Sequence, residues 1–192
     1  MTENNLFAGK LVRLVAPEPE KIAPLFSRWG RDAEYGRLLD SDAPRLWSAN
    51  SIKTWLEEEL EKENAPLSFF MIHTLEDDRP IGFVDLGYRF WQQGNAWVGI
   101  GIGDRDDWSK GYGTEAMQLL LAYAFDELNL HRVSLGVFEF NPRARRSYEK
   151  AGFKVEGRER AFINRDGRRW DVVIMGILRH EWEALRQDNL DT

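Results

Sequence analysis

The sequence contains no cysteine. Disulfides, thiolate zinc sites and a cysteine nucleophile are therefore excluded. Histidine is scarce as well: His73, His131 and His180 lie far apart without the spacing of metal ligands, so we predict no metal site. No apolar run approaches the ~18 residues of a membrane span, and the start of the chain lacks the basic region and apolar core of a signal peptide. We expect a cytoplasmic protein without a membrane partner.

Basic residues are too few for a typical nucleic-acid binder. The chain has 26 Lys and Arg against 32 Asp and Glu, for a formal net charge of −6 at pH 7, whereas a nucleic-acid-binding protein usually carries a basic stripe. The 192 residues, 43% of them hydrophobic, are enough for one domain with a well-buried core. We predict a single domain over residues 8–182 and a C-terminal tail over residues 183–192.

Hydrophobic periodicity predicts the order of the elements. Strands are predicted at residues 10–15, 67–74, 80–90, 95–103, 132–140, 157–164 and 168–178. Helices are predicted at residues 20–29, 52–64, 114–128 and 142–151. We expect Ser51 to cap the second helix and residues 31–49 to be irregular. Only the third helix connects its strands like a parallel crossover, so the expected fold class is α/β (α+β), with a mixed, mostly antiparallel central sheet flanked by helices.

One glycine-rich stretch lies between the strand at 95–103 and the helix that follows it. The chain reads WVGIGIG, then a charged loop, then Gly111-Tyr112-Gly113 at the opening of the helix. Such an opening leaves backbone N–H groups unpaired beside the positive end of the helix dipole. Because Gly111 and Gly113 have no Cβ, an anion can approach that backbone closely. The stretch therefore predicts a phosphate or pyrophosphate site.

Other phosphate motifs can be compared with this loop. Gly111-x-Gly113-x-x-Ala116 matches a dinucleotide fingerprint, and Glu139 lies at the end of the next strand. However, a charged loop separates the glycines from their strand, little chain remains for further βα units, and the preceding strands look antiparallel. An NAD-type dinucleotide-binding protein is thus the less favoured alternative. A P-loop is excluded, because no G-x-x-x-x-G-K-[ST] is present.

Residues 108–116, WSKGYGTEA, resemble the acetyl-CoA pyrophosphate loop of the GNAT N-acetyltransferase superfamily, and residues 141–153, NPRARRSYEKAGF, resemble its second signature. The resemblance extends over residues 8–182, and the RimJ/RimL-like branch is the most similar. It implies a GNAT-like acyl-CoA N-acyltransferase fold, acetyl-CoA as co-substrate, and direct transfer of the acetyl group to a primary amine through a tetrahedral intermediate. The amine would belong to a protein N-terminus or to a small molecule.

The resemblance also implies functional residues. Backbone amides of residues 108–114 would hold the pyrophosphate, residues 98–102 would pair with the pantetheine amides, and Tyr148 would protonate the departing thiolate. The cofactor-binding residues implied in this way are Ile100, Ile102, Trp108, Ser109, Lys110, Gly111, Tyr112, Gly113, Thr114, Asn141 and Tyr148. Asn141 can also be explained as a helix N-cap before a proline, and Tyr148 as a core aromatic residue, so both interpretations stay open.

The sequence departs from the superfamily at two positions. Trp108 stands where the loop often begins with Gln or Arg, and Trp97 stands where relatives often carry a Glu that acts as general base. Asp85 and Glu139 remain as candidates for a catalytic base, and either can instead be a solvated strand residue. Without catalysis, the chain would be an acetyl-CoA-binding module of the same fold.

The acceptor amine must be neutral when it attacks. At pH 7 about one α-amine in seven is neutral, a penalty of ~1 kcal/mol, whereas an amine of pKa ~10.4 carries a penalty of about 4.6 kcal/mol. An enzyme without a strong base is therefore better suited to weakly basic amines. Trp47, Trp91 and Trp97 are candidates for the lining of an acceptor cleft, with packing as the alternative. The oligomeric state is left open, with a homodimer as one option.

Overall fold

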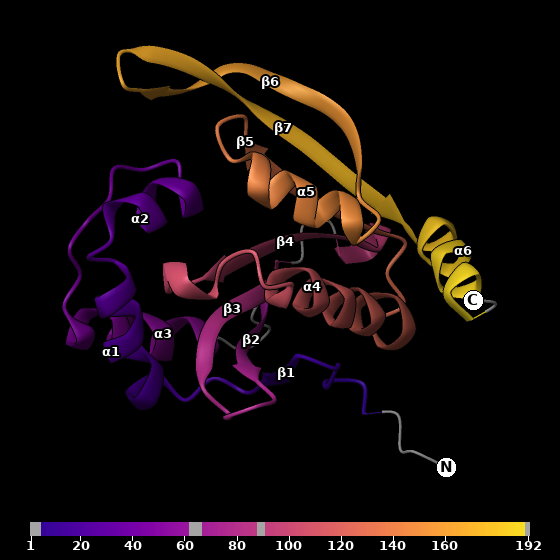
Figure 1. Ribbon diagram of the computed structural model, residues 1–192, viewed down its shortest axis with the longest axis horizontal. Coiled ribbons are helices and arrows are strands. Elements are labelled where there is room, and N and C mark those ends of the chain that lie inside the picture. Colours follow the sequence, from indigo (N-terminus) through magenta and orange to yellow (C-terminus); the bar gives the residue numbers. More distant parts are fainter. Residues whose placement is uncertain (1–4, 62–66, 88–90, 191–192) are drawn as a thin grey trace.

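The computed structural model describes residues 5–61, 67–87 and 91–190. Its centre is a seven-stranded sheet in the order β1-β2-β3-β4-β5-β7-β6 (Figure 1). The strands are β1 Val12–Val15, β2 Leu67–Thr74, β3 Pro80–Gly87, β4 Asn95–Ile102, β5 Arg132–Phe138, β6 Lys154–Arg165 and β7 Arg168–Leu178. Neighbouring strands run antiparallel, except that β4 and β5 are parallel. The predicted mixed, mostly antiparallel sheet is therefore confirmed.

Helices cover both faces of this sheet. They are α1 Pro19–Trp29, α2 Ala33–Leu39, α3 Ala49–Leu60, α4 Tyr112–Ala122, α5 Pro142–Lys150 and α6 Arg179–Leu190. On one face, α4, α5 and α6 pack on the larger core, whose members include Met117, Leu120 and Trp182. On the other face, α1, α2 and α3 pack on a smaller core with Trp29 and Phe83. Figure 1 shows α1, α2 and α3 grouped at the end of the molecule opposite α6.

The main difference from the expected elements lies in residues 31–49, for which the prediction of an irregular segment is wrong. This segment contains α2, whose N-cap Asp32 accepts a hydrogen bond from the Glu34 amide (3.0 Å). The predicted cap of α3 is also wrong. Ser48, not Ser51, is the N-cap, because Ser48 Oγ accepts a hydrogen bond from the Ser51 amide (3.1 Å). Both short polar caps fix helices whose apolar pattern alone is weak.

Smaller differences concern the ends of elements. β6 begins at Lys154, three residues before the predicted strand. The helix predicted at residues 114–128 is α4 as far as Ala122 and continues as a π-helix, Tyr123–Glu127. Most of the predicted tail, residues 183–190, belongs to α6. The predicted ends at residues 62–64 and 88–90 lie outside the described residues. Among the described helices, none combines the length and the apolar character that crossing a bilayer requires.

β4 and β5 pair over a short length and then separate. In the described ladder only residues 95–97 of β4 pair with β5, whereas β4 stays paired with β3 as far as Ile102. Because the Gly103 amide donates to the Ile81 carbonyl (2.8 Å), the alternation of an antiparallel ladder turns the peptide groups of Ile100 and Ile102 away from β3. These groups therefore face the gap between the two parallel strands.

On one face of β4, glycines occupy successive positions, so that the strand backbone is bare there. The residues that form this glycine column are Gly99, Gly101 and Gly103. A Cβ added to the first would lie 2.6 Å from Asp85 Oδ2, one added to the second 3.1 Å from the Tyr35 hydroxyl oxygen, and one added to the third against the Trp29 ring. The glycine column thus lets side chains from β3, α2 and α1 lie directly on the strand backbone.

Candidate active site

A cavity of about 370 Å³ opens at the beginning of α4, and we call it the α4 cavity. Gly111 precedes the helix with a φ of +90°, a left-handed conformation that favours glycine. No described side chain caps the helix there, so its first amides and the positive end of its dipole are left for a ligand. A Cβ at Gly113 would lie 3.7 Å from Ile102 Cγ1, in the space that an anion would enter. The α4 cavity therefore has the properties of an anion site.

Almost all of the predicted cofactor-binding residues line the α4 cavity. They are Ile100, Ile102, Trp108, Ser109, Gly111, Tyr112, Gly113, Thr114, Asn141 and Tyr148. Lys110 is not among them, and its Nζ lies 3.8 Å from Asp107 Oδ1. Sequence reasoning missed Arg143 and Arg146, which line the same cavity from α5. Their signal was the cluster of arginines inside the second signature, and they add positive charge to the wall.

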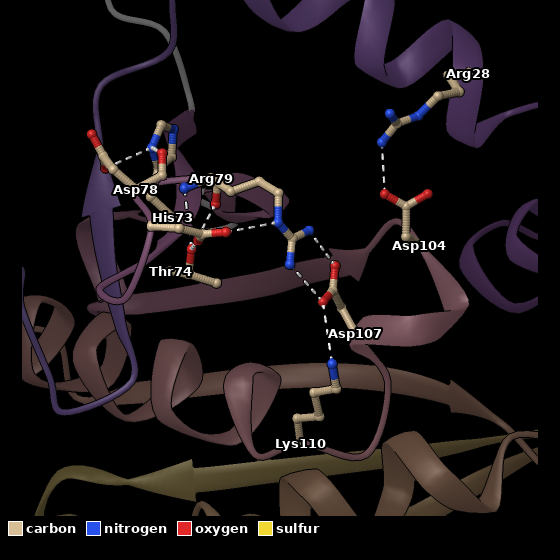
Figure 2. Close-up of polar contacts among 9 residues, drawn as sticks. Arg28, His73, Thr74, Asp78, Arg79, Asp104, Asp107 and Lys110 are labelled. Carbon is tan, nitrogen blue, oxygen red and sulfur yellow. Dashed lines mark hydrogen bonds and ion pairs between the residues drawn. The ribbon is translucent and has the colours of Figure 1, made fainter.

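The loop before α4 is anchored by a buried carboxylate (Figure 2). Asp107 is 3% exposed and accepts hydrogen bonds from both terminal nitrogens of Arg79, at 2.7 and 2.9 Å. These bonds hold the pKa of Asp107 below its usual value. At the other end of the loop, Arg28 on α1 donates to Asp104 (2.6 Å). The loop is thereby fixed to the sheet and to α1, which positions the opening of α4.

Trp108 joins three parts of the α4 cavity. Its Nε1 donates a hydrogen bond to the Ile102 carbonyl at the end of β4 (2.8 Å). The guanidinium of Arg143 lies over the indole ring, 3.5 Å from its centroid, in cation–π geometry. Burial lowers the pKa of Arg143 from its usual value. Trp108 is thus the platform for a positive charge that α5 brings to the cavity.

Glu115, in the first turn of α4, ties the helix to the start of the sheet. Its carboxylate accepts hydrogen bonds from the backbone amides of Lys10 (2.9 Å), Leu11 (2.7 Å) and Val12 (2.8 Å). A Cβ at Gly9 would collide with the same carboxylate. An acidic side chain in the first turn is also favoured by the helix dipole. The opening of α4 is therefore held from both sides, by this contact and by the anchored loop.

α5 brings the second signature to the cavity. Asn141 is the N-cap of α5, and its side-chain oxygen accepts a hydrogen bond from the Ala144 amide (3.1 Å). The expectation that Asn141 caps this helix is therefore correct, and the residue lines the α4 cavity as well. One turn later, the hydroxyls of Ser147 and Thr114 lie 2.8 Å apart and join α5 to α4. The two signature segments thus meet across the cavity.

A second cavity, of about 690 Å³, lies between α2, α3 and the glycine column, and we call it the α2 cavity. Its walls are largely apolar and aromatic. The aromatic residues that line it are Phe26, Tyr35, Trp47, Trp55, Phe83, Phe138 and Tyr148. A concave apolar site with a few polar groups is typical of small-ligand binding.

The two cavities meet at a common wall. The residues that line both are Tyr35, Leu38, Leu39, Ile100, Asn141 and Tyr148. Burial raises the pKa of Tyr148 to about 12, an effect that the nearby Arg143 partly opposes. The phenol of Tyr148 is therefore protonated at neutral pH and can donate a proton or a hydrogen bond. A ligand in either cavity can reach this group.

Asp85 lies in the α2 cavity, on β3 and against Gly99 of the glycine column. Burial raises the pKa of Asp85 to about 7, although a hydrogen bond from the Gly99 backbone works in the opposite direction. A carboxyl group with a pKa near the operating pH can both accept and release a proton. Of the two predicted bases, Asp85 therefore has the environment that base chemistry needs.

Glu139, the other predicted base, lies away from the cavities. Its carboxylate accepts hydrogen bonds from Arg158 (3.4 Å) and from the Asp171 amide (3.3 Å), and the residue lines neither the α4 nor the α2 cavity. Among the tryptophans proposed for an acceptor cleft, Trp47 lines the α2 cavity and Trp97 does not. The side chain of Trp91 lies outside the described part of the chain.

Within the described residues, no three His, Cys, Asp or Glu side chains lie close enough together to hold a metal ion. The site consists instead of an anion-binding helix opening, a phenol and a carboxyl group of raised pKa. Both the phenol and the carboxyl group line the α2 cavity, and groups of this kind can transfer protons.

Known proteins share both the sequence pattern and the architecture. A family model described as acetyltransferase (GNAT) domain matches residues 12–154. The SPbeta prophage-derived uncharacterized N-acetyltransferase YokL of Bacillus subtilis (strain 168) is 31% identical over 178 residues, which cover 92% of this chain and 95% of YokL. The putative ribosomal N-acetyltransferase YdaF of the same organism is 29% identical over 175 residues, which cover 90% of this chain and 93% of YdaF.

Among solved structures, the fold matches that of spermidine N-acetyltransferase from Vibrio cholerae, crystallised in complex with CoA and spermine. The TM-score is 0.79, with 23% sequence identity, and the alignment covers 90% of this chain and 98% of the other. At this level of identity the likeness shows a common fold.

Proposed function

The chain belongs to the GNAT acetyltransferase family, with acetyl-CoA as its co-substrate, and on this premise we propose that it transfers the acetyl group directly to a primary amine. One observation carries the proposal: the α4 and α2 cavities meet at Tyr148, with Asp85 in the wall of the α2 cavity. Two ligands can therefore reach one point from two sides. The dinucleotide-binding alternative is wrong, because the family uses acetyl-CoA and β4 lies in a mostly antiparallel sheet.

The α4 cavity fits the donor. The free amides at the opening of α4, together with Arg143, supply the positive potential that a pyrophosphate needs. The amide and carbonyl of Ile100 and the amide of Ile102 face the gap beside β4, where an extended ligand with amide groups can pair with them, whereas the Ile102 carbonyl already accepts from Trp108 Nε1. When bound, the donor supplies an activated acetyl thioester. The protein contributes the binding, the orientation and the proton transfers.

We assign the proton of the attacking amine to Asp85. An amine in the α2 cavity loses one proton to the Asp85 carboxylate as its nitrogen forms a bond to the acetyl carbon. Because the pKa of Asp85 is about 7, this carboxylate is a far better base near neutral pH than an ordinary aspartate of pKa ~3.9. Asp85 thus takes the place of the glutamate that relatives carry on the following strand.

We assign the departing group to Tyr148. As the carbon–sulfur bond breaks, the thiolate takes a proton from the Tyr148 hydroxyl, so that the free thiol is released. The Tyr148 phenolate then regains a proton from solvent, and Asp85 gives up to solvent the proton that it took from the amine. Burial keeps Tyr148 protonated until this step. A thiol of pKa ~8.5 would not by itself draw a proton from a phenol of higher pKa, so the hydrogen bond must be held in place by the cavity wall.

The acceptor is either the α-amine of a protein N-terminus or the amine of a small molecule. Similarity to the putative ribosomal N-acetyltransferase YdaF supports a place in the RimJ/RimL-like branch. The fold likeness to spermidine N-acetyltransferase supports an amine acceptor of some kind. A homodimer stays a prediction.

The experiment is a thiol-release assay with acetyl-CoA and a panel of amines: α-amines of peptides, arylalkylamines, polyamines and aminoglycosides. We expect turnover with at least one class. Tyr148→Phe should lower kcat about 10²-fold, the scale of a lost general acid, while the affinity for acetyl-CoA stays unchanged in calorimetry. Tight binding of acetyl-CoA without transfer to any amine would contradict the proposed transfer and favour a binding module.

A further inference from the structure

The α2 cavity also indicates what kind of amine the protein accepts, an inference that rests on the proposed acetyl transfer. The carboxyl group of Asp85 lines the α2 cavity and lies against Gly99 of the glycine column. Around it the lining is largely hydrocarbon and aromatic, with Phe26 and Phe83 on the same face of the sheet. A single ammonium group therefore meets a carboxylate there, whereas the rest of the ligand meets apolar walls.

The rim of the α2 cavity carries two acidic residues, Asp40 and Asp42, and one basic residue, Arg45. Asp42 and Arg45 form an ion pair (4.0 Å), and the Asp40 carboxylate accepts a hydrogen bond from the Asp42 amide (3.1 Å). A second ammonium group at this rim would meet the carboxylates of Asp40 and Asp42 as well as the guanidinium of Arg45. A second ammonium group deeper in the cavity would lose its hydration against apolar walls, which costs several kcal/mol unless a partner compensates. An amine whose second ammonium group would have to lie among these apolar walls is therefore a poor fit.

Two tryptophans extend the apolar lining to the surface. Trp47 and Trp55 both line the α2 cavity, yet their side chains are 53% and 48% exposed. Large aromatic surfaces left in contact with water commonly mark binding sites. Ser27 Oγ donates to the Trp47 carbonyl (2.8 Å), which fixes the loop that carries this indole. Both rings are thus placed to cover a flat apolar group.

The wall of the cavity is held in one shape by a residue distant in sequence. Arg165, at the end of β6, donates hydrogen bonds to the backbone carbonyls of Arg37, Asp40 (2.6 Å) and Asp42 (3.0 Å). Arg37 also pairs with Asp166 in the hairpin turn. The end of α2 and the following loop are therefore pinned to the β6–β7 hairpin. The resulting volume of about 690 Å³ lies within the range of small-molecule sites, about 300–1,000 Å³.

We propose that the acceptor is a small primary amine with one positive charge, carried on an apolar framework of the size of an arylalkylamine. Its nitrogen lies beside Asp85, where it binds as the ammonium ion and loses one proton to solvent before the neutral amine attacks. Its framework lies between the sheet and the two indoles of Trp47 and Trp55. The nitrogen then lies at the common wall with the α4 cavity, where Tyr148 and the acyl end of the donor meet.

The test compares 2-phenylethylamine, methylamine, spermidine and a peptide with an N-terminal phenylalanine in the thiol-release assay. We expect kcat/KM for 2-phenylethylamine to exceed that for spermidine at least about tenfold. Trp47→Ala and Trp55→Ala should each lower kcat/KM for 2-phenylethylamine about tenfold, the scale of a lost aromatic contact, and leave methylamine unchanged. Phe162→Ala is the matched control, because Phe162 is an exposed aromatic residue outside the α2 cavity and its loss should change none of the rates.

A spermidine rate equal to or above that of 2-phenylethylamine would overturn the inference and leave acetyl transfer standing. A peptide rate more than tenfold above that of the free amine would overturn the assignment to a small molecule. Calorimetric titration of 2-phenylethylamine into the protein with CoA present gives a readout independent of turnover. Binding that Trp47→Ala weakens supports the inference even if the transfer itself fails, and binding that it leaves unchanged contradicts it.

Discussion

Asp85 and Gly99 face each other across β3 and β4, and the Asp85 carboxyl group occupies the space where a side chain at position 99 would begin. A Cβ at position 99 would lie 2.6 Å from Asp85 Oδ2, closer than real side-chain contacts allow. The carboxyl group is therefore buried against the strand backbone, and this burial raises its pKa to about 7. The base chemistry that we assign to Asp85 thus depends on the absence of a side chain at position 99 of the neighbouring strand.

Asp85→Asn should lower kcat/KM for the amine about 10²-fold or more, which is the usual contribution of a positioned general base. In the wild type we expect kcat/KM to rise with pH through an inflection near pH 7, because Asp85 must lose its proton before it can accept one. The variant should lack that inflection. The measurement is kcat/KM from pH 5.5 to 8.5 for both proteins, and an inflection that persists in the variant would exclude Asp85 as the base.

Ionisation of Asp85 should raise activity but lower the stability of the fold. In the unfolded chain the pKa of Asp85 is ~3.9, whereas in the folded state it is about 7. Between these values the folded protein keeps a proton that the unfolded chain loses, so the contribution of Asp85 to stability is complete below about pH 4 and is lost as the pH rises through about 7.

Asp85→Asn, which cannot ionise, should therefore gain stability relative to the wild type as the pH rises from 4 to 8, on the order of 3 kcal/mol. Urea denaturation of both proteins at pH 4.5 and pH 8 measures this difference. An identical pH dependence in the two proteins would show that Asp85 ionises normally in the fold.

Gly113→Ala separates folding from donor binding. An added methyl group would make only ordinary contacts, 3.7 Å from Ile102 Cγ1 and 3.9 Å from Ile100 Cδ1, so we expect stability to be unchanged or slightly raised. The methyl group would, however, occupy the approach to the helix opening. The affinity for acetyl-CoA should fall at least about tenfold, because a close anion contact is lost.

Gly157→Ala serves as its control, since nothing lies within 4 Å of a Cβ at that position. Calorimetric titration with acetyl-CoA should give wild-type affinity for the control. Wild-type affinity in Gly113→Ala as well would place the pyrophosphate elsewhere.

Tyr35→Phe should leave the protein as stable as the wild type, or more stable by about 1 kcal/mol. The Tyr35 hydroxyl is buried and has no hydrogen-bond partner among the described residues, and an unsatisfied buried hydroxyl costs free energy. The variant keeps the ring contact with Trp29, whose centroid lies 6.4 Å away. Urea denaturation checks this expectation. A loss of more than 1 kcal/mol would mean that the hydroxyl has a stabilising partner.

Local signals allowed much of the fold and the α4 cavity to be predicted. The apolar stripe of α4 and the two glycines that open it are contained in one short stretch, so their structure depends little on distant residues. The N-cap at Asn141 is equally local. These are the features that short-range sequence patterns encode.

α2 could not be predicted in the same way. It is short, contains Gly36 in its interior, and follows the cap Asp32. Its end is held by hydrogen bonds from Arg165, a residue more than 120 positions later in the chain. Because α2 carries Tyr35 into the common wall of the cavities, missing α2 also meant missing that residue.

The choice between Asp85 and Glu139 likewise required tertiary structure. Both are single acidic residues on or beside strands. What distinguishes them is burial against Gly99 in one case and an exposed contact with Arg158 in the other. The sequence around Trp108 likewise did not reveal the cation–π contact of this residue, because the cation over its ring belongs to Arg143 on α5.

The glycine column has a consequence for how acceptor preference can diverge between relatives of this chain. A strand that presents bare backbone on one face leaves the shape of the adjoining space to Tyr35, Trp29 and other side chains from the first helices. Those helices can exchange residues without disturbing any hydrogen bond of the sheet. Substitutions on those helices that spare Arg28 and the residues of the common wall can therefore alter selectivity while the thioester site stays constant.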